Sequence, residues 1–439
     1  MKSNNPVVSQ VIKDYSNSQK AFLPRQIIIP LTQEKELTYT CLVNPGDFVK
    51  EGEIIAISQE EKGKQAKIHS SLPGKVLEVS ECISPSGKKS IGVKIQFGGS
   101  FTYLGKKKSE SKTDEKSSEI IKSLLDYGII NTFKTEYPEN LGMQLSEQVS
   151  SKEKKKVIVV RMFDEDPYRI TDSLMSKLYF DEIVKGARIT ASAIGAEGII
   201  FAVDQKFFDL EIFNKQEYQD IKPLEMNIRR YPCGTPREII SAYEKSNIKK
   251  TYNYNLKKSS LFTDSCTMYE VFKAIDNSMP CIDRLIHISG NCLYASCLLE
   301  VKIGTTLKDL VSQIGGFAKE PSLIVINGLL CGSSVQTLDI PITKYVKSVE
   351  FISKSRKADS QMHTCINCGN CRFACPVKLS PDILYNNTVN FKRLSNCLAA
   401  SSLACIECGL CNTVCPARLP LCQIITILKN NNTEKKSKK

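Results

Sequence analysis

The sequence has few of the features that would assign a protein to a functional class at once, such as clustered histidines, a long apolar run or an apolar leader. It holds only three histidines, His69, His287 and His363, which are too far apart in the chain to suggest a histidine metal site. It has no run of eighteen apolar residues, as a membrane span needs, because the longest candidate, residues 189–203, is interrupted by Glu197. The first twenty residues are polar and contain no apolar leader, so we expect a reducing cytoplasm.

Acidic residues are fewer than basic residues, and the formal net charge is +13. Lysine runs at residues 106–108, 154–156 and 435–439 lie in Ser/Glu/Thr-rich or Asn-rich surroundings, which are typical of solvated linkers. Two interpretations stay open for these runs: solubilising segments, or attraction to an anionic membrane surface or an acidic electron carrier. We expect no nucleic acid partner, because aromatic residues are not interleaved with the lysines.

Cysteine, in contrast, is abundant, and eight of the eighteen cysteines fall in two runs of the form C-x2-C-x2-C-x3-C-P. In each run three closely spaced cysteines can converge on one iron–sulfur cube, and glycines 369 and 409 let the backbone bend around it. Zinc is the alternative, but closed zinc sites usually use two separated cysteine pairs. The sequence therefore predicts two [4Fe-4S] clusters and single-electron transfer.

The fourth cysteine of each run is expected to serve the other cluster, as in two-cluster ferredoxins. This assigns two ligand sets: Cys365, Cys368, Cys371 and Cys415 for the first cluster, and Cys405, Cys408, Cys411 and Cys375 for the second. The remaining ten cysteines are expected to be small buried hydrophobic residues: Cys41, Cys82, Cys233, Cys266, Cys281, Cys292, Cys297, Cys331, Cys397 and Cys422.

Residues 26 to about 99 predict short β-strands. Glycines 46 and 52 fall at turns between alternating apolar residues, and residues 69–77 repeat the pattern as a return limb. The pair resembles the barrel-sandwich fold of biotinyl and lipoyl carrier domains. The carrier lysine would fall near Gly63, beside Lys62 or Lys64, but no Met-Lys-Met or Asp-Lys-Ala sequence surrounds it, so we expect an unmodified structural module.

The middle of the chain predicts an α/β segment followed by a smaller β module. Residues 157–160 and 198–203 are continuous apolar strands, and residues 172–195 between them predict one long helix with Asp172 as N-cap and Gly195 at its end. A strand, a crossover helix and a strand indicate a parallel sheet. Residues 286–352 predict short strands and a helix over 307–314. The two cysteine runs predict helix-poor loops, and residues 381–403 between them predict a helix.

This order of parts resembles the RnfC subunit of the Rnf ion-translocating electron transport complex. The segments Cys375-Pro-Val-Lys-Leu-Ser-Pro381 and Cys415-Pro-Ala-Arg-Leu-Pro-Leu421 carry it most specifically, and Tyr231-Pro-Cys-Gly234 and Asn327-Gly-Leu-Leu-Cys-Gly332 also take part. The resemblance implies a multidomain α/β and β fold. Its expected parts are a polar arm (1–25), a barrel-sandwich hybrid (26–100), a charged linker (101–119), a Rossmann-like α/β domain of the NADH/FMN type (120–260), an SLBB-like β-grasp module (261–355), a two-cluster ferredoxin-like domain (356–428) and a basic tail (429–439).

Family members bind FMN and NADH in the α/β domain, and here both flavin segments are altered. The glycine-rich phosphate loop corresponds to residues 128–138, of which only Gly128 and the pair Tyr137-Pro138 remain. The second segment retains carboxylates at Asp164 and Asp166, which are the candidate FMN-binding residues, but has Arg161 in place of an amide. The alternative for these carboxylates is an acidic helix-capping loop before Ile170.

Two function classes stay open from the sequence. In the first, the protein oxidises NADH through FMN and releases electrons through its two clusters. In the second, it is a relay and scaffold subunit without NADH activity, supplied by ferredoxin or flavodoxin; a corrinoid-reductase-like iron–sulfur flavoprotein is a more distant alternative. The resemblance implies a peripheral subunit at the cytoplasmic face of the plasma membrane, bound to other subunits of an ion-translocating oxidoreductase. We favour the relay.

Overall fold

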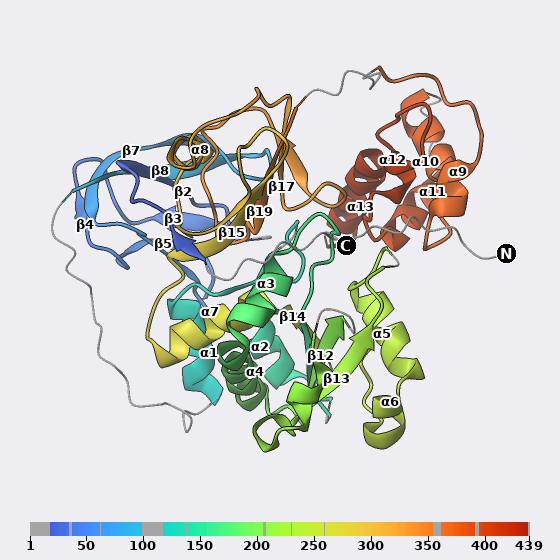
Figure 1. Ribbon diagram of the computed structural model, residues 1–439, viewed down its shortest axis with the longest axis horizontal. Helices are drawn as coiled ribbons and strands as arrows, with labels where there is room; N and C mark the ends of the chain where they lie inside the picture. Colours follow the sequence, from blue (N-terminus) through green and yellow to red (C-terminus); the bar gives the residue numbers. More distant parts are fainter. Residues whose placement is uncertain are drawn as a thin grey trace.

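A computed structural model of the chain describes residues 18–34, 37–61, 63–98, 117–136, 138–153, 155–204, 208–229, 231–258, 260–353, 361–390 and 395–437, with only the backbone of 433–437. Figure 1 shows two β-rich modules side by side, an α/β domain below them and a small helical domain that holds the cysteine runs. Lys62, Lys106 to Lys108, Lys154 and Tyr137 lie outside the described residues. Within these ranges no helix is both long and apolar enough to cross a bilayer.

The N-terminal module consists of two short sheets that share one core, in which Ile27, Ile55 and Val93 are fully buried. Gly46 and Gly52 adopt positive φ at the predicted turns. Gly63 and Lys64 lie in the turn where a carrier lysine would stand, and Lys64 contacts Glu61 there. The strands are β2 (Gln26–Pro30), β3 (Tyr39–Cys41), β4 (Phe48–Val49), β5 (Ile54–Ser58), β6 (Lys67–His69), β7 (Gly74–Ile83) and β8 (Lys89–Phe97).

The α/β domain is built on a parallel sheet of four strands in the order β13-β12-β11-β14. The two strands predicted from apolar runs are present as β11 (Val157–Arg161) and β12 (Gly198–Asp204), joined by β13 (Ile221–Met226) and β14 (Ser260–Asp264). All five residues of β11 are buried, as expected for a central strand covered on both faces. The predicted parallel sheet is therefore confirmed.

The prediction of one long helix over 172–195 is wrong. The segment forms two helices, α3 (Thr171–Leu178) and α4 (Phe180–Ile194), and Tyr179 separates them with φ −134° and ψ 41°. The break lets the Tyr179 ring pack on Tyr269, with 4.5 Å between the ring centroids, while Phe180 enters a cluster of aromatic rings. Gly195 ends α4 in the left-handed conformation, as predicted, whereas Asp172 lies inside the first turn of α3 and is not its N-cap.

The other helices of this domain pack around the sheet. They are α1 (Ser117–Asp126), α2 (Leu141–Ser150), α5 (Pro236–Lys245), α6 (Asn247–Tyr252) and α7 (Ser265–Asp276), with short 3₁₀ helices at Leu210–Asn214 and Gln216–Tyr218 and a small ribbon of β9 (Ile130–Asn131) and β10 (Glu139–Asn140). Because β14 pairs with β11 and α7 packs on α4, the α/β unit extends through residue 276 and beyond the boundary expected at residue 260.

The third module is a mixed six-stranded sheet in the order β1-β16-β15-β19-β17-β18, with one helix that matches the predicted helix over 307–314. Residues 19 and 20, expected in a polar arm, form β1 and pair with β16. The elements are β1 (Gln19–Lys20), β15 (Asp283–Ser289), β16 (Cys297–Lys302), α8 (Leu307–Gln313), β17 (Leu323–Ile326), β18 (Ser333–Val335) and β19 (Ser348–Ile352).

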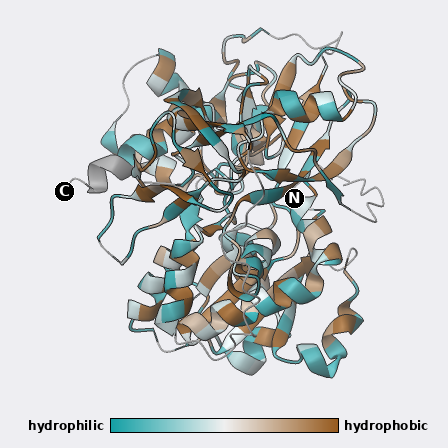
Figure 2. Cartoon of the chain, turned by 90° about the vertical axis from the view of Figure 1, so that its left-hand side faces the viewer, coloured by the Kyte–Doolittle hydropathy of each residue, from teal (hydrophilic) through white to brown (hydrophobic). Residues whose placement is uncertain are grey.

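The cysteine-rich domain is more helical than the sequence predicted. Each run contains a short helix that includes its third cysteine, so the expectation of helix-poor loops is wrong at these positions. The elements are α9 (Asn370–Ala374), α10 (Pro381–Tyr385), a π-helix (Asn386–Asn390), α11 (Asn396–Ser401), a 3₁₀ helix (Ser402–Ala404), α12 (Leu410–Thr413) and α13 (Leu421–Ser437). The helix α13 covers most of the expected tail. Figure 2 shows that hydrophilic and hydrophobic residues alternate along many helices of the chain.

Candidate metal centre

The two cysteine runs have the same backbone fold. Asn367 and Glu407, which follow the first cysteine of each run by two residues, both have positive φ, 54° and 60°. Gly369 and Gly409 have φ 78° and 71° and begin α9 and α12. The left-handed conformation at these positions turns each loop back on itself, so that the next cysteine faces the same interior as the previous two.

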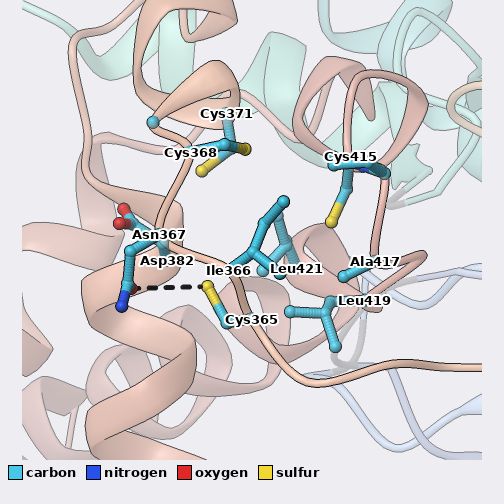
Figure 3. A pocket seen from close by; sticks show the side chains of 12 residues that line it. Cys365, Ile366, Asn367, Cys368, Cys371, Asp382, Cys415, Ala417, Leu419 and Leu421 are labelled. Carbon is cyan, nitrogen blue, oxygen red and sulfur yellow. Dashed lines mark hydrogen bonds between the residues drawn. The ribbon is translucent and has the colours of Figure 1, made fainter.

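One hollow in this domain has cysteines of both runs on its wall (Figure 3). It contains about 330 Å³ of space not filled by protein atoms, and Ile366, Leu419 and Leu421 line it with apolar surface. Its sulfur-bearing residues are Cys365, Cys368, Cys371 and Cys415. The structure thus brings together the four cysteines that the sequence assigns to the first cluster.

A second hollow of about 310 Å³ lies between the first three cysteines of the second run and the last cysteine of the first run. Its walls include Ile406 and Ile425, and five cysteines line it: Cys375, Cys405, Cys408, Cys411 and Cys422. The first four are the residues assigned to the second cluster. The fifth, Cys422, was expected to be a small buried hydrophobic residue.

The donor chemistry of both hollows fits an iron–sulfur cluster. Burial raises the pKa of Cys371 to about 11 and of Cys408 to about 12, so these thiols need a nearby positive charge to lose their protons at neutral pH. Backbone amides already point at two sulfurs of the second hollow: the Leu379 N–H donates to Cys375 Sγ at 3.2 Å and the Glu407 N–H to Cys405 Sγ at 3.4 Å. Such bonds stabilise thiolates and tune cluster potentials.

The sulfurs stand around a space and do not converge on a point. Within the described residues, no group of three or more His, Cys, Asp or Glu side chains is arranged to hold a single metal ion. A tetrahedral zinc site requires such convergence, with all four sulfurs at bonding distance from one atom. A polynuclear cluster, whose four irons are spread over the corners of a cube, fits these walls better.

The second hollow faces the rest of the molecule. The Tyr231 hydroxyl donates to the Cys408 carbonyl oxygen at 2.7 Å and lies 3.1 Å from Cys331 Sγ. A Cβ on residue 409 would stand 2.5 Å from the Leu330 carbonyl oxygen, so the close approach of the two loops requires glycine. The loop of residues 327–332 between β17 and β18, here called the β-module loop, therefore contacts the second cysteine run, as does the turn that begins at Tyr231.

The first hollow faces outward. Phe373, Ile366 and Met362 beside it are 90%, 68% and 65% exposed, and Cys368 is exposed. His363 is also exposed, and its backbone N–H donates to the Ala417 carbonyl oxygen. The three exposed apolar residues Phe373, Ile366 and Met362, which lie within or just before the first cysteine run, are here called the outer patch.

Arg161, in the altered flavin segment, is fully buried at the end of β11. Its guanidinium donates to the carbonyl oxygens of Phe133 and Gly234 at 2.8 and 3.0 Å, and its Cζ lies 4.2 Å from the centroid of the Phe133 ring. Its Nη1 also forms an ion pair with Glu165 Oε2 at 3.1 Å. Arg161 thus joins the loop that corresponds to the family's phosphate loop to the turn at Gly234.

The two candidate flavin carboxylates both bind groups of the chain itself. Asp164 accepts hydrogen bonds from the backbone N–H groups of Asp172 and Ser173 and pairs with Arg169 at 3.0 Å, so it caps the N-terminus of α3. Asp166 accepts from the backbone N–H groups of Leu330 and Cys331 at 2.7 and 2.9 Å. One carboxylate stabilises a helix, and the other fastens the β-module loop.

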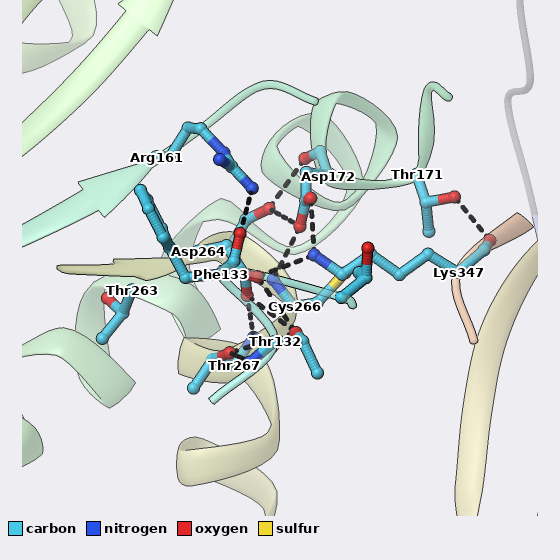
Figure 4. Close-up of polar contacts among 12 residues, drawn as sticks. Thr132, Phe133, Arg161, Thr171, Asp172, Thr263, Asp264, Cys266, Thr267 and Lys347 are labelled. Atoms are coloured by element: carbon cyan, nitrogen blue, oxygen red, sulfur yellow. Dashed lines mark hydrogen bonds and ion pairs between the residues drawn. The ribbon is translucent and has the colours of Figure 1, made fainter. Parts of the chain in front are cut away.

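A buried ionic network fills the carboxyl edge of the parallel sheet beside them (Figure 4). Lys347 comes from the β module just before β19, and its Nζ lies 2.6 Å from Asp172 and 2.7 Å from Asp264. All three side chains have no exposed surface. Thr132 donates to Asp264, so the altered loop is part of the same network. Ligands of open α/β sheets usually bind at this edge.

Several residues near the hollows were missed at the sequence level. Tyr231 was noted only as part of a family segment, and Cys331 only as part of another and as a small buried hydrophobic residue. Asp382 was not singled out, although it lines the first hollow. One signal was available for Cys422. It follows Cys415 by the same seven residues that separate Asp382 from Cys375, so the repeat itself places both beside a hollow.

Family models match both ends of the chain. The model described as the RnfC barrel sandwich hybrid domain matches residues 8–99, and a 4Fe-4S dicluster domain matches residues 364–419. The barrel-sandwich prediction is therefore confirmed, and the second match supports iron–sulfur clusters in the domain with the two hollows.

Two relatives extend over most of the chain. The C subunit of the proton-translocating ferredoxin:NAD(+) oxidoreductase complex of Clostridium ljungdahlii is 26% identical over 365 residues, which cover 82% of this chain and 78% of that protein. The C subunit of the Na(+)-translocating ferredoxin:NAD(+) oxidoreductase complex of Acetobacterium woodii is 23% identical over 361 residues, with 82% and 80% coverage. The resemblance to the RnfC subunit that the sequence predicted is confirmed.

One solved structure supports the fold. The chain matches a chain of the NAD+-reducing [NiFe]-hydrogenase in the H2-reduced state with a TM-score of 0.51 and 13% identity. The match covers 75% of this chain and 63% of that one. At this identity the likeness concerns the architecture alone.

Proposed function

From its similarity to the RnfC subunits of Rnf-type complexes, we propose that this chain is a peripheral electron-transfer subunit of an ion-translocating oxidoreductase. The observation that supports this most directly is the pair of hollows, each lined by cysteines from both runs. When bound, a [4Fe-4S] cluster supplies reversible one-electron chemistry without protons or bond changes in a substrate.

The protein's part is to hold, insulate and connect the two sites. Cys365, Cys368, Cys371 and Cys415 are proposed as ligands of the first cluster, and Cys405, Cys408, Cys411 and Cys375 of the second. Apolar walls exclude water, and the amides that donate to sulfur stabilise the thiolates. Because each set draws one cysteine from the other run, the two sites are fixed relative to each other.

The contacts of the two hollows suggest different roles. The second cysteine run touches the body of the protein through Tyr231 and Leu330, and the first hollow lies beside the exposed outer patch. We assign the inner site to exchange within the protein and the outer patch to a redox partner or a membrane subunit. Ferredoxin, flavodoxin and NADH are the candidate soluble partners. Since the two relatives named above move different ions, the ion stays open.

The relay version of this function agrees best with the contacts of the altered flavin segments. To bind FMN through Asp164 and Asp166, the chain would have to give up the cap of α3 and the anchor of the β-module loop. The network of Lys347, Asp172 and Asp264 also occupies the edge at which α/β sheets usually bind ligands. The NADH-oxidising version with FMN remains the alternative function.

One experiment separates the two versions. The purified protein is incubated with FMN, desalted and assayed for bound flavin, for NADH-dependent reduction of an artificial acceptor, and for reduction of its clusters by a reduced carrier. We expect no bound flavin, no NADH activity and cluster reduction by the carrier. A C368A/C408A variant, which lacks a ligand at each site, should lose the carrier-dependent signal. Stoichiometric flavin with rapid NADH oxidation would refute the relay.

For location we propose the cytoplasmic face of the plasma membrane, reached through other subunits and aided by the net charge of +13. Screening reduces the reach of such charges to about 8 Å at physiological ionic strength, so salt should release part of the protein from isolated membranes. Release by detergent alone would contradict this docking. For the fold we propose a Rossmann-like α/β domain and an SLBB-like β-grasp module around β15 and β19.

A further inference from the structure

Five cysteines line the second hollow, one more than a cube needs. The additional residue is Cys422, in the first turn of α13, where its neighbours Leu421 and Ile425 are 1% exposed. Its backbone N–H donates to Asn412 Oδ1 at 2.8 Å. The position of this thiol is therefore fixed by the helix and by a hydrogen bond.

The first hollow has a different residue at the equivalent place in the repeat. Asp382 stands there, and Arg372 holds its carboxylate through Nε at 2.8 and 3.0 Å. In the second run Asn412 occupies the position of Arg372, so no cation stands there. The two hollows thus differ by an exchange of two residues: an arginine–aspartate pair at one and an asparagine–cysteine pair at the other.

Cys422 is close enough to take part in the second site. It lines the same hollow as Cys405 and Cys411, which are both assigned ligands. A thiolate is the preferred protein ligand of iron in such clusters, whereas the carboxylate of Asp382 is a hard donor that is already bound to Arg372. Only the second hollow therefore has a free soft donor on its wall among the described residues.

We propose that Cys422 is a reserve ligand of the second cluster and replaces Cys405; this inference rests on the proposed function, since it requires that the cluster is bound. In the exchange the iron–sulfur bond to Cys405 breaks and one to Cys422 forms. The thiol proton of Cys422 is transferred to the released thiolate of Cys405, so charge and atoms balance. When Cys405 is absent, the proton leaves to solvent and Cys422 binds the open iron.

The test compares four proteins, each purified anaerobically and analysed for iron, acid-labile sulfide and the EPR spectrum of the reduced state. The wild type, Cys422→Val and Cys405→Ala should each hold about eight irons, and Cys405→Ala/Cys422→Val only about four, since one cube of four irons is lost. The reduced Cys405→Ala protein should give a shifted second-cluster EPR signal, because one ligand then comes from α13.

Other outcomes have distinct meanings. About four irons in Cys405→Ala, with about eight in the wild type, would overturn the reserve role and leave the proposed function intact. Loss of four irons from Cys422→Val alone would show a permanent ligand, which also overturns it. A wild type without iron would overturn the proposed function and this inference with it. If Cys405→Ala does not fold, Cys405→Ser with and without Cys422→Val gives the same comparison, because serine oxygen binds iron less well than thiolate.

Discussion

At the scale of single residues, the charged groups inside the molecule act mainly on each other. Lys347 bridges Asp172 and Asp264, and it comes from a different module than either carboxylate. A buried ion pair of this kind adds little net stability, but the loss of one partner leaves buried charge without compensation. The network therefore fixes how the β module sits on the α/β sheet.

Replacing Lys347 with methionine should lower the free energy of unfolding by about 3–5 kcal/mol, because both buried carboxylates lose their cation. Chemical denaturation followed by circular dichroism measures the change. Lys89→Met is the matched control, since its partner Glu81 and Lys89 itself are 68% and 80% exposed and the pair should contribute almost nothing. Equal stability of the two variants would refute the structural role of Lys347.

Glu350, on β19, makes stability depend on pH. Burial, and then the negative charge of Asp166, raise the pKa of Glu350 from its ordinary value of 4.5 to about 7. The folded protein thus keeps a proton that the unfolded chain releases, and the free energy of unfolding falls as the pH rises through this range. Glu350→Gln should equal the wild type near pH 4.5 and exceed it at pH 8 by on the order of 1 kcal/mol, since water partly screens the carboxylate. A difference in the free energy of unfolding between Glu350→Gln and the wild type that stays the same at every pH would contradict this.

At the scale of elements, the two cysteine runs depend on each other. Cys375 belongs to the first run and lines the second hollow, and Cys415 does the reverse. Neither loop completes a set of four donors alone, which links folding of one loop to that of the other.

The variant Cys375→Ala tests whether each run supplies one ligand to the other run's cluster. We expect the signal of the second cluster to be lost or altered in EPR while that of the first persists, and the iron content to fall from about eight toward about four. Cys397→Ala is the control, since Cys397 lies on α11 and lines neither hollow. Loss of the first cluster's signal alone would reverse the assignment.

Sequence patterns predicted the elements better than their contacts. Continuous apolar runs were enough for β11 and β12, because a strand buried on both faces has no polar side. The same apolar spacing hid the break at Tyr179, which depends on aromatic partners distant in the chain. At the candidate site, spacing suggested the ligand sets, but the contacts of Asp164 and Asp166 with α3 and Leu330 arise only from the tertiary fold.

At the scale of the whole molecule, the modules meet around the second cysteine run. The β-module loop, the turn at Tyr231 and the run itself join there, and the parallel sheet supports them through Arg161 and Asp166. The first run lies outside this junction, beside the outer patch. The architecture therefore places one candidate redox site against the other modules and the other beside exposed apolar side chains, an arrangement suited to a relay.

Metal analysis of the anaerobically purified wild type tests the central claim most directly. If both hollows hold cubes, each chain should contain about eight irons and eight acid-labile sulfides, with broad visible absorption that bleaches on reduction. Stoichiometric zinc without that absorption would contradict the account.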